Sequence, residues 1–213
     1  MELTVRNLSV ARGGITVLEG LGFTLAPGRA LVLRGPNGVG KTTLLRTLCG
    51  LQPAVRGEIA APPEGLAYAS HADGLKSMLD VRENLAFWAA VFGTGPAAVA
   101  RALERMNLST LAARRAANLS AGQKRRLGLA RLLVSGRPVW VLDEPTVSLD
   151  TASVALFAGV IRDHLGQGGS ALIATHIDLG LDEAEILDLT PFRAATGALA
   201  QAWGDDPFLG DFA

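Results

Sequence analysis

A glycine-rich loop constrains this chain more than any other feature of its sequence. Residues 35–42 read GPNGVGKT and match the pattern G-x-x-x-x-G-K-[ST] in full. The apolar run Ala30–Leu33 before the loop predicts a buried strand. After the loop, Leu44, Leu45 and Leu48 lie on one face of a predicted helix. This order of strand, anion-wrapping loop and helix predicts an α/β fold in which the loop joins a sheet to a helix.

The residue types in this loop are those that bind the phosphates of a nucleoside triphosphate. Gly35, Gly38 and Gly40 allow the backbone to wrap tightly, and N–H groups at the start of the helix point towards anions. Lys41 supplies a positive charge for the β- and γ-phosphates, and Thr42 supplies a hydroxyl ligand for Mg²⁺. The predicted nucleotide-binding residues of the loop are Gly35, Pro36, Asn37, Gly38, Val39, Gly40, Lys41, Thr42 and Thr43.

An acidic motif follows another predicted strand. Val139–Leu142 is a continuous apolar run, and Asp143, Glu144 and Pro145 come directly after it. An acidic residue at the carboxyl end of a parallel strand lies at the crevice where such sheets bind ligands. We expect Asp143 to hold Mg²⁺ through its water shell and Glu144 to orient or deprotonate an attacking water. Two adjacent carboxylates favour a hydrolase over a kinase, because a kinase must exclude water.

The remaining predicted elements alternate between strands and helices at both ends of the chain, which implies a mainly parallel sheet with both faces covered. A mostly helical segment, residues 80–136, is inserted between the two ends. Residues after about 190 are rich in Ala, Gly and Asp and predict a surface extension. The other predicted elements are a pair of short strands at 55–60 and 66–69, a helix at 151–166 and a strand at 171–174.

The composition excludes several classes of protein. The 213 residues include 20 Lys and Arg against 20 Asp and Glu, and this zero net charge argues against nucleic-acid binding through bulk electrostatics. The single cysteine, Cys49, excludes an internal disulfide. The longest apolar run, Leu85–Phe92, is far shorter than the roughly 20 residues that span a bilayer. We therefore expect one domain that neither spans a membrane nor is secreted, although its 49% hydrophobic content indicates surface that needs a partner.

Three further motifs point to a family. Residues 119–123 read LSAGQ, residues 148–150 read Ser-Leu-Asp, and His176 follows the predicted strand at 171–174. Together with the phosphate loop and the acidic pair, these motifs make the chain resemble the ATP-binding-cassette (ABC) ATPases over residues 1 to about 190. The resemblance implies an α/β fold, the P-loop NTPase fold of an ABC nucleotide-binding domain, with a mainly parallel sheet core. It also implies an N-terminal antiparallel β subdomain, an α-helical subdomain inserted at about 72–136, a single domain over 1–213 and a C-terminal tail at about 190–213.

The resemblance further implies what the motifs do. ABC ATPases bind ATP and Mg²⁺ and form a head-to-tail homodimer in the ATP-bound state, with the nucleotides sandwiched between the subunits. Glu144 and His176 are the implied catalytic residues, because His176 would bond the γ-phosphate and fix the attacking water. Asp150 would cross the dimer interface. The implied signature residues, which contact the ATP held by the other subunit, are Ser120, Ala121, Gly122 and Gln123.

Two positions depart from the family pattern. His71 stands where the Gln-loop of the family has glutamine, in an alignment anchored on the run Val81–Leu85. A histidine can still contact Mg²⁺-bound water, with a charge that varies near neutral pH. Arg12 stands just before Gly13 and Gly14, where an adenine-stacking aromatic residue is expected. Its guanidinium can stack on adenine, and a solvated loop residue with weak base stacking is an equal alternative.

Within the family, the short length, the two departures and the stretches LSAGQKRRLGLARLL and WVLDEPTVSLD resemble the ATPase subunit of the cytochrome c biogenesis haem exporter. That resemblance implies integral membrane subunits of the CcmB and CcmC types as partners and a peripheral place on the cytoplasmic face of the bacterial inner membrane. The chain has no C-x-x-C-H motif for haem attachment, so we expect no direct haem binding. The alternatives are the ATPase of another exporter, for a lipid, drug or metal, or a soluble ABC ATPase outside transport.

The apolar stretch 74–92 has two interpretations. Its large side chains, which include Met78, Leu85 and Phe87, either belong to the core of the helical subdomain or line a groove that receives a helix of a membrane subunit. The first interpretation needs these side chains to be buried, and the second needs some of them to be exposed.

Overall fold

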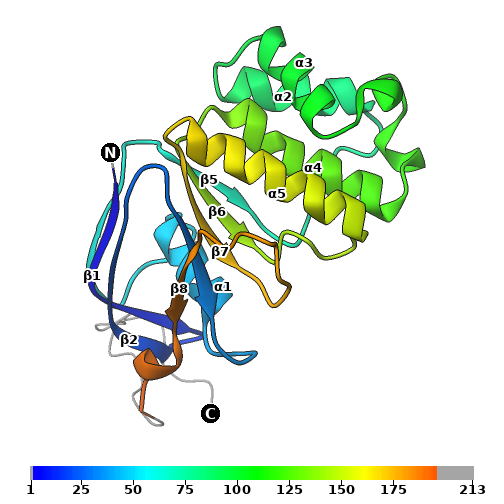
Figure 1. Ribbon diagram of the computed structural model, residues 1–213. Coiled ribbons are helices and arrows are strands. Elements are labelled where there is room, and N and C mark those ends of the chain that lie inside the picture. The colour runs from blue at the N-terminus through cyan, green and yellow to red at the C-terminus, as the bar shows by residue number, and fades with distance from the viewer. Residues whose placement is uncertain (1, 196–213) are drawn as a thin grey trace, which may run out of the picture.

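The computed structural model of the protein describes residues 2–195, and its strands form two sheets (Figure 1). The first sheet is antiparallel and has three strands in the order β2-β1-β4. A tight turn at Gly13 and Gly14, with φ angles of 56° and 77°, joins β1 to β2 in a conformation that glycine adopts readily. The strands of this sheet are β1 (Leu3–Arg12), β2 (Ile15–Leu25) and β4 (Arg56–Ala60).

The second sheet has five strands in the order β5-β6-β7-β3-β8, and all of its pairings are parallel. The phosphate loop leads from β3 into α1 (Lys41–Leu48), and α5 (Thr151–Gly166) connects β6 to β7. The predicted strand, loop and helix are therefore confirmed. The strands are β3 (Ala30–Arg34), β5 (Leu66–Ala69), β6 (Val139–Asp143), β7 (Ser170–Ala174) and β8 (Glu185–Asp188).

Three helices in the segment between β5 and β6 form a lobe at the upper right of Figure 1. The first helix begins with a capping box, in which the Asp80 carboxylate accepts from the Glu83 N–H at 2.7 Å and the Glu83 carboxylate accepts from the Asp80 N–H at 2.8 Å. The third helix returns to the sheet and contacts β5. These helices are α2 (Val81–Val91), α3 (Pro96–Arg105) and α4 (Ala121–Ser135), and the 3₁₀ turns are η1 (Ser109–Leu111), η2 (Ala116–Asn118) and η3 (Thr190–Phe192).

The parallel sheet separates two hydrophobic cores. Along β3, Leu31 and Leu33 belong to one core and Ala30 and Val32 to the other, because successive side chains of a strand point to opposite faces. The first core also contains residues of the antiparallel sheet and of α1, and the second contains residues of α2 to α5. Both faces of the sheet are therefore covered, which confirms the predicted α/β architecture with its antiparallel β part and its helical insertion.

One prediction about the strands needs correction, and one strand was not predicted. The strands predicted at 55–60 and 66–69 are present but do not pair with each other, since β4 pairs with β1 and β5 pairs with β6. An apolar pattern shows that a segment is extended, whereas its partner depends on contacts far away in the chain. The edge strand β8 was not predicted, because its exposed side chains, among them Ile186 at 68% exposure, leave no core-facing pattern. Of the predicted tail, residues 196–213 lie outside the described residues.

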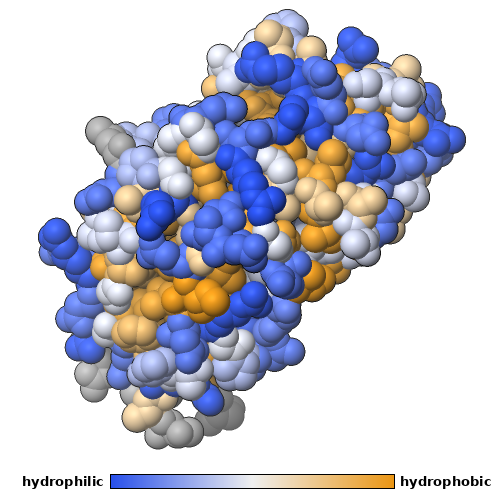
Figure 2. Space-filling view, in the orientation of Figure 1, coloured by the Kyte–Doolittle hydropathy of each residue, from blue (hydrophilic) through white to orange (hydrophobic). Residues whose placement is uncertain are grey.

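Hydrophobic side chains on the face shown in Figure 2 form separate patches with hydrophilic side chains between them. Within the stretch 74–92, Leu85 is buried in the core of the helical subdomain, whereas Met78 is 71% exposed and Phe87 is 40% exposed. The groove for a helix of a membrane subunit remains a prediction. Over residues 2–195, none of the helices combines the length and the apolar composition that crossing a bilayer requires.

The substitution Leu44→Ala tests how strongly the core anchors α1, which carries the phosphate loop. Leu44 is 0% exposed, and we expect its loss to lower the free energy of unfolding by about 2–5 kcal/mol, because a cavity remains in the packed core. The matched control is Leu51→Ala, since Leu51 follows α1 and is 54% exposed; it should cost less than about 0.5 kcal/mol. Urea denaturation followed by circular dichroism measures both, and equal effects would contradict the anchoring.

Candidate active site

The phosphate loop is held in a backbone conformation that glycine favours. Gly35, Gly38 and Gly40 have φ angles of 142°, 80° and 117°, all outside the range that other residues adopt easily. Space is also limited at Gly40, because a Cβ atom there would lie 3.1 Å from the Val17 Cγ2. The loop therefore curls against β2 and presents its backbone at the start of α1, where the free N–H groups of a helix favour anions.

The ammonium group of Lys41 lies inside this curl. Its Nζ donates to the Gly35 carbonyl at 2.8 Å and to the Pro36 carbonyl at 3.4 Å, and the residue is 8% exposed. Burial lowers the pKa of Lys41, while the carboxylates of Glu144 and Asp143 oppose that change. A cation in this place, next to helical N–H groups, is suited to bind phosphate oxygens.

The oxygen atoms that could hold Mg²⁺ meet at the end of β6. The Thr42 hydroxyl donates to Asp143 Oδ1 at 3.1 Å, and the Tyr68 hydroxyl donates to Asp143 Oδ2 at 3.1 Å. A hydroxyl and a carboxylate beside a phosphate loop fit Mg²⁺, which takes few protein ligands and completes its shell with phosphate and water oxygens. Burial, together with the charge of Asp143, raises the pKa of Tyr68 and keeps its hydroxyl a donor. Tyr68 was not predicted as a site residue, because its contact with Asp143 depends on the pairing of β5 with β6.

Glu144 and His176 lie opposite each other at the ends of β6 and β7. The His176 Nε2 lies 3.6 Å from the Glu144 Oε1. In addition, the backbone N–H of His176 donates to the Glu144 Oε2 at 3.4 Å. Glu144 adopts a φ of 47°, which is uncommon for a residue with a side chain. Its N–H donates to the Ala174 carbonyl at 2.8 Å, so the bend is tied to the neighbouring strand. A carboxylate held in this way can accept a proton from a water molecule.

Lys41, Thr42, Asp143, Glu144 and His176 line one pocket of about 320 Å³. Arg12, at the end of β1, and Val17, near the start of β2, are among the residues that line it. Arg12 was predicted as a site residue and Val17 was not, although the apolar alternation of β2 is a signal that points to Val17. The residues lining the pocket are Arg12, Val17, Asn37, Gly38, Gly40, Lys41, Thr42, Thr43, Asp143, Glu144 and His176.

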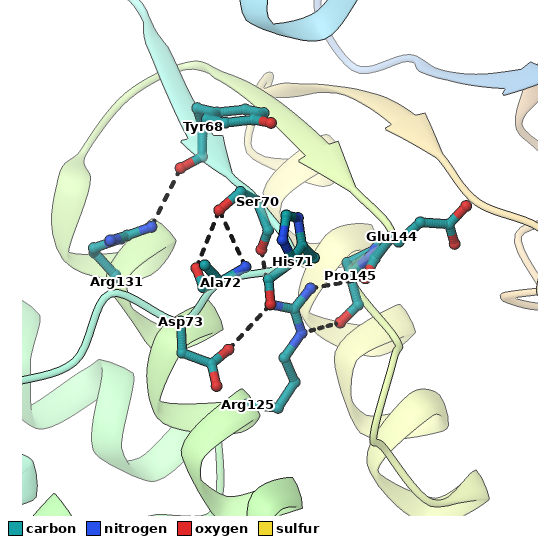
Figure 3. Close-up of polar contacts among 9 residues, drawn as sticks. All are labelled: Tyr68, Ser70, His71, Ala72, Asp73, Arg125, Arg131, Glu144 and Pro145. Atoms are coloured by element: carbon teal, nitrogen blue, oxygen red, sulfur yellow. Dashed lines mark hydrogen bonds and ion pairs between the residues drawn. The ribbon is translucent and has the colours of Figure 1, made fainter. Parts of the chain in front are cut away.

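His71 is not among the described residues that line this pocket. It is exposed in the loop that follows β5, and its backbone carbonyl accepts from Arg125 Nη1 at 3.3 Å (Figure 3). Its predicted contact with the magnesium ion remains a prediction.

The signature residues start α4, apart from the pocket. Ser120 and Gln123 form a capping box, with the Ser120 hydroxyl accepting from the Gln123 N–H at 3.3 Å and the Gln123 side chain accepting from the Ser120 N–H at 3.0 Å. Asp150 caps α5 by accepting from the Ser153 N–H at 2.8 Å, and hydrogen bonding with Ser153 lowers the pKa of Asp150. A Cβ atom on Gly122 would lie 3.4 Å from the Ser148 carbonyl, so the signature and the Ser-Leu-Asp motif are neighbours.

The fold and the pocket define a P-loop nucleoside triphosphatase. Residues 18–147 match the model of the ABC transporter family, so the chain belongs to this family and is an ATPase. An ATP-binding protein from Pyrococcus furiosus has the same fold: the two structures superpose with a TM-score of 0.81 over 91% of this chain and 100% of that one, at 27% sequence identity.

Curated relatives are more similar still. The cytochrome c biogenesis ATP-binding export protein CcmA of Cereibacter sphaeroides is 70% identical to this chain over 99% of both sequences. The protein with the same name from Rhodobacter capsulatus is 70% identical over 90% of this chain and 89% of its own length. The resemblance to this group of ABC ATPases is therefore confirmed.

The substitution Lys41→Ala tests the assignment of the phosphate loop. We expect ATP binding to fall below detection and turnover to be lost, because no other described cation donates into the curl of the loop. Isothermal titration with ATP and a phosphate-release assay measure the two effects. Lys76→Ala is the matched control, since Lys76 is exposed and its Nζ lies over the Phe87 ring. Substantial hydrolysis by the Lys41 variant would contradict the assignment.

Proposed function

We propose that this chain is the ATP-hydrolysing subunit of the ABC exporter of cytochrome c biogenesis, and that the exported cargo is haem. The observation that carries this proposal is the 70% identity to the CcmA protein of Cereibacter sphaeroides over 99% of both chains. The identity extends over the strands, helices and motifs described above, because the match covers 210 residues of this chain. The pocket that gathers Lys41, Asp143, Glu144 and His176 supports ATP hydrolysis as its chemistry.

In the proposed reaction, the N–H groups of the phosphate loop and the Lys41 ammonium bind the β- and γ-phosphates of ATP. Thr42 and Asp143 would hold the magnesium ion, which would neutralise phosphate charge. Glu144 accepts a proton from the attacking water, and its contact with His176 keeps the carboxylate directed into the pocket. His176 in turn bonds the γ-phosphate. The nucleotide site comprises these residues together with Gly35, Pro36, Asn37, Gly38, Val39, Gly40, Thr43 and Arg12.

The signature residues act on the nucleotide of a second protomer in this proposal. Ser120, Ala121 and Gly122 start a 15-residue helix, whose first N–H groups favour an anion. They lie apart from the pocket that contains Lys41, so one chain does not surround its own nucleotide. A head-to-tail homodimer in the ATP-bound state would complete both sites, with Gln123 beside the phosphates and Asp150 at the interface.

Roles are also proposed for Arg12 and His71, the two residues that depart from the family pattern. Arg12 is exposed at the pocket border, a position from which its planar guanidinium can stack on adenine. His71 is exposed in the loop after β5, and we assign it to the Mg²⁺-bound water once the loop closes on the nucleotide.

The partners proposed are integral membrane subunits of the CcmB and CcmC types, which would hold this chain on the cytoplasmic face of the bacterial inner membrane. The exposed Met78 and Phe87 of the helical subdomain, residues 72–136, support this part, since exposed apolar side chains favour a protein contact. We propose no contact with nucleic acid and no direct contact with haem. The domain is proposed to extend over residues 1–213, with residues 190–213 as its tail.

The substitution Glu144→Gln separates ATP binding from ATP hydrolysis. The amide cannot accept the proton of the water, so we expect turnover to fall by about 100-fold or more while ATP still binds. The ATP-bound variant should then accumulate as a homodimer in light scattering. Glu104→Gln is the matched control, because Glu104 is exposed on α3 outside the pocket. A Glu144 variant that stays monomeric at saturating ATP would contradict the sandwich dimer.

Purification of the tagged chain from detergent-solubilised membranes tests the proposed exporter. We expect membrane subunits of the CcmB and CcmC types to copurify, because the cassette has exposed apolar side chains but no membrane-spanning helix among its described residues. Mass spectrometry identifies the partners. Recovery of the subunits of a lipid, drug or metal exporter in their place would overturn the assignment to haem export while leaving the ATPase assignment intact.

A further inference from the structure

One buried arginine of α4 joins two loops at the edge of the active site. Arg125 is 3% exposed, and all three of its guanidinium nitrogens donate hydrogen bonds. The Nε donates to the Pro145 carbonyl at 2.8 Å and the Nη2 to the Glu144 carbonyl at 2.8 Å. The Nη1 donates to the Ser70 carbonyl at 2.8 Å and to the Asp73 carboxylate at 3.0 Å. The guanidinium therefore holds the loop after β6 on one side and the loop after β5 on the other (Figure 3).

The contact on the β6 side acts on the backbone of Glu144. At this residue the chain leaves the strand with a φ of 47°, a conformation that costs energy for a residue other than glycine. Two hydrogen bonds hold it there: the Glu144 N–H donates to Ala174, and the Glu144 carbonyl accepts from Arg125. The direction of the carboxylate towards His176 follows from this backbone conformation. Arg125 thus fixes the direction of a carboxylate that it does not touch.

The contact on the β5 side depends on a glycine. Gly128 lies one turn further along α4, and a Cβ atom there would lie 2.9 Å from Asp73 Oδ1 and 3.0 Å from the Asp73 Cβ. The absence of a side chain at Gly128 lets the loop lie directly on the helix, with Asp73 in reach of Arg125. The side chain of Asp73 is 26% exposed, so this loop can shift outwards when the helix surface changes.

We propose that Arg125 is a positioning residue for ATP hydrolysis: it transmits the position of the loop Ser70–Asp73 to the backbone of Glu144. Displacement of that loop then lowers the rate of the chemical step by more than it changes the affinity for ATP. A lysine cannot replace this arginine fully, because an ammonium has three donors and no planar fork to reach both loops. The inference rests on the proposed role of Glu144.

The first test compares Arg125→Met and Arg125→Lys with the wild-type chain in steady-state ATP hydrolysis. We expect kcat to fall by about tenfold or more in Arg125→Met, with KM for ATP changed by less than about threefold, and a partial recovery of kcat in Arg125→Lys. Arg126→Met is the matched control, since among the described residues the neighbouring Arg126 donates to the Met106 and Asn107 carbonyls of the helical lobe and to neither active-site loop. Its kcat should stay within about twofold of wild type even where its thermal stability falls.

The second test leaves Arg125 in place and moves the loop. Gly128→Ala introduces the Cβ atom that would collide with Asp73, and we expect kcat to fall by about threefold or more at unchanged KM. Gly159→Ala is its control, because a Cβ atom there has open space in the middle of α5 and alanine favours a helix. In the double variant Arg125→Met/Gly128→Ala, the second substitution should have no further effect, since the link it acts through is already lost.

These measurements separate the inference from the role of Glu144. If Glu144→Gln retains wild-type turnover, the proposed role of Glu144 fails and the inference falls with it. If Glu144→Gln is inactive while Arg125→Met and Gly128→Ala keep kcat within about twofold of wild type, the inference alone is overturned. A rise in KM that accounts for the loss in either variant also overturns it, because a misplaced phosphate loop would then be the cause. If Arg125→Met does not fold, Gly128→Ala and Arg125→Lys decide by the same criteria.

Discussion

The parallel alignment of β3, β6 and β7 is the constraint on which the whole site depends. Ala174, at the end of β7, is the register partner of Leu33 on one side and of Asp143 on the other. Three strands therefore end on one line, and the residues that follow them all leave the sheet at the same edge. This puts the start of the phosphate loop, Glu144 and His176 beside one another, although more than 100 residues of sequence separate the first from the last. The crevice beyond such an edge is where parallel sheets bind ligands.

Several groups at this edge would each destabilise the fold if they stood alone, and they depend on one another for compensation. Lys41 is buried, and desolvation works against its charge, while the nearby carboxylates of Asp143 and Glu144 work in its favour. Glu144 holds an uncommon backbone conformation that hydrogen bonds from two directions maintain. Removal of any of these groups therefore lowers the free energy of unfolding by more than the loss of its own contacts, because its partner is left buried without a compensating interaction. The two hydrophobic cores supply the stability that keeps such a site in place.

The parts that could be predicted from the sequence are those that local chemistry dictates. The positive φ angles of Gly35, Gly38 and Gly40 favour glycine, so the spacing of the glycines predicts the conformation of the loop. Asp143 and Glu144 follow the apolar run Val139–Leu142, and this places them at the carboxyl end of β6. Tyr68 and Val17 were missed because they reach the site through the pairing of β5 with β6 and through the packing of β2 against Gly40. The pairing of β4 with β1 was missed for the same reason.

The buried charge of Arg125 follows from the way the strands end. A strand that leaves a sheet exposes carbonyl groups that have lost their ladder partners, and buried carbonyls need donors. At the ends of β5 and β6 these carbonyls belong to Ser70, Glu144 and Pro145, and one guanidinium serves all three. An apolar side chain could fill the space but would leave the acceptors unsatisfied. A single rigid guanidinium donates to the carbonyls at both strand ends. When one loop moves, it therefore displaces the hydrogen-bond donor of the other loop. The coupling between the two loops is in this way a consequence of backbone hydrogen bonding.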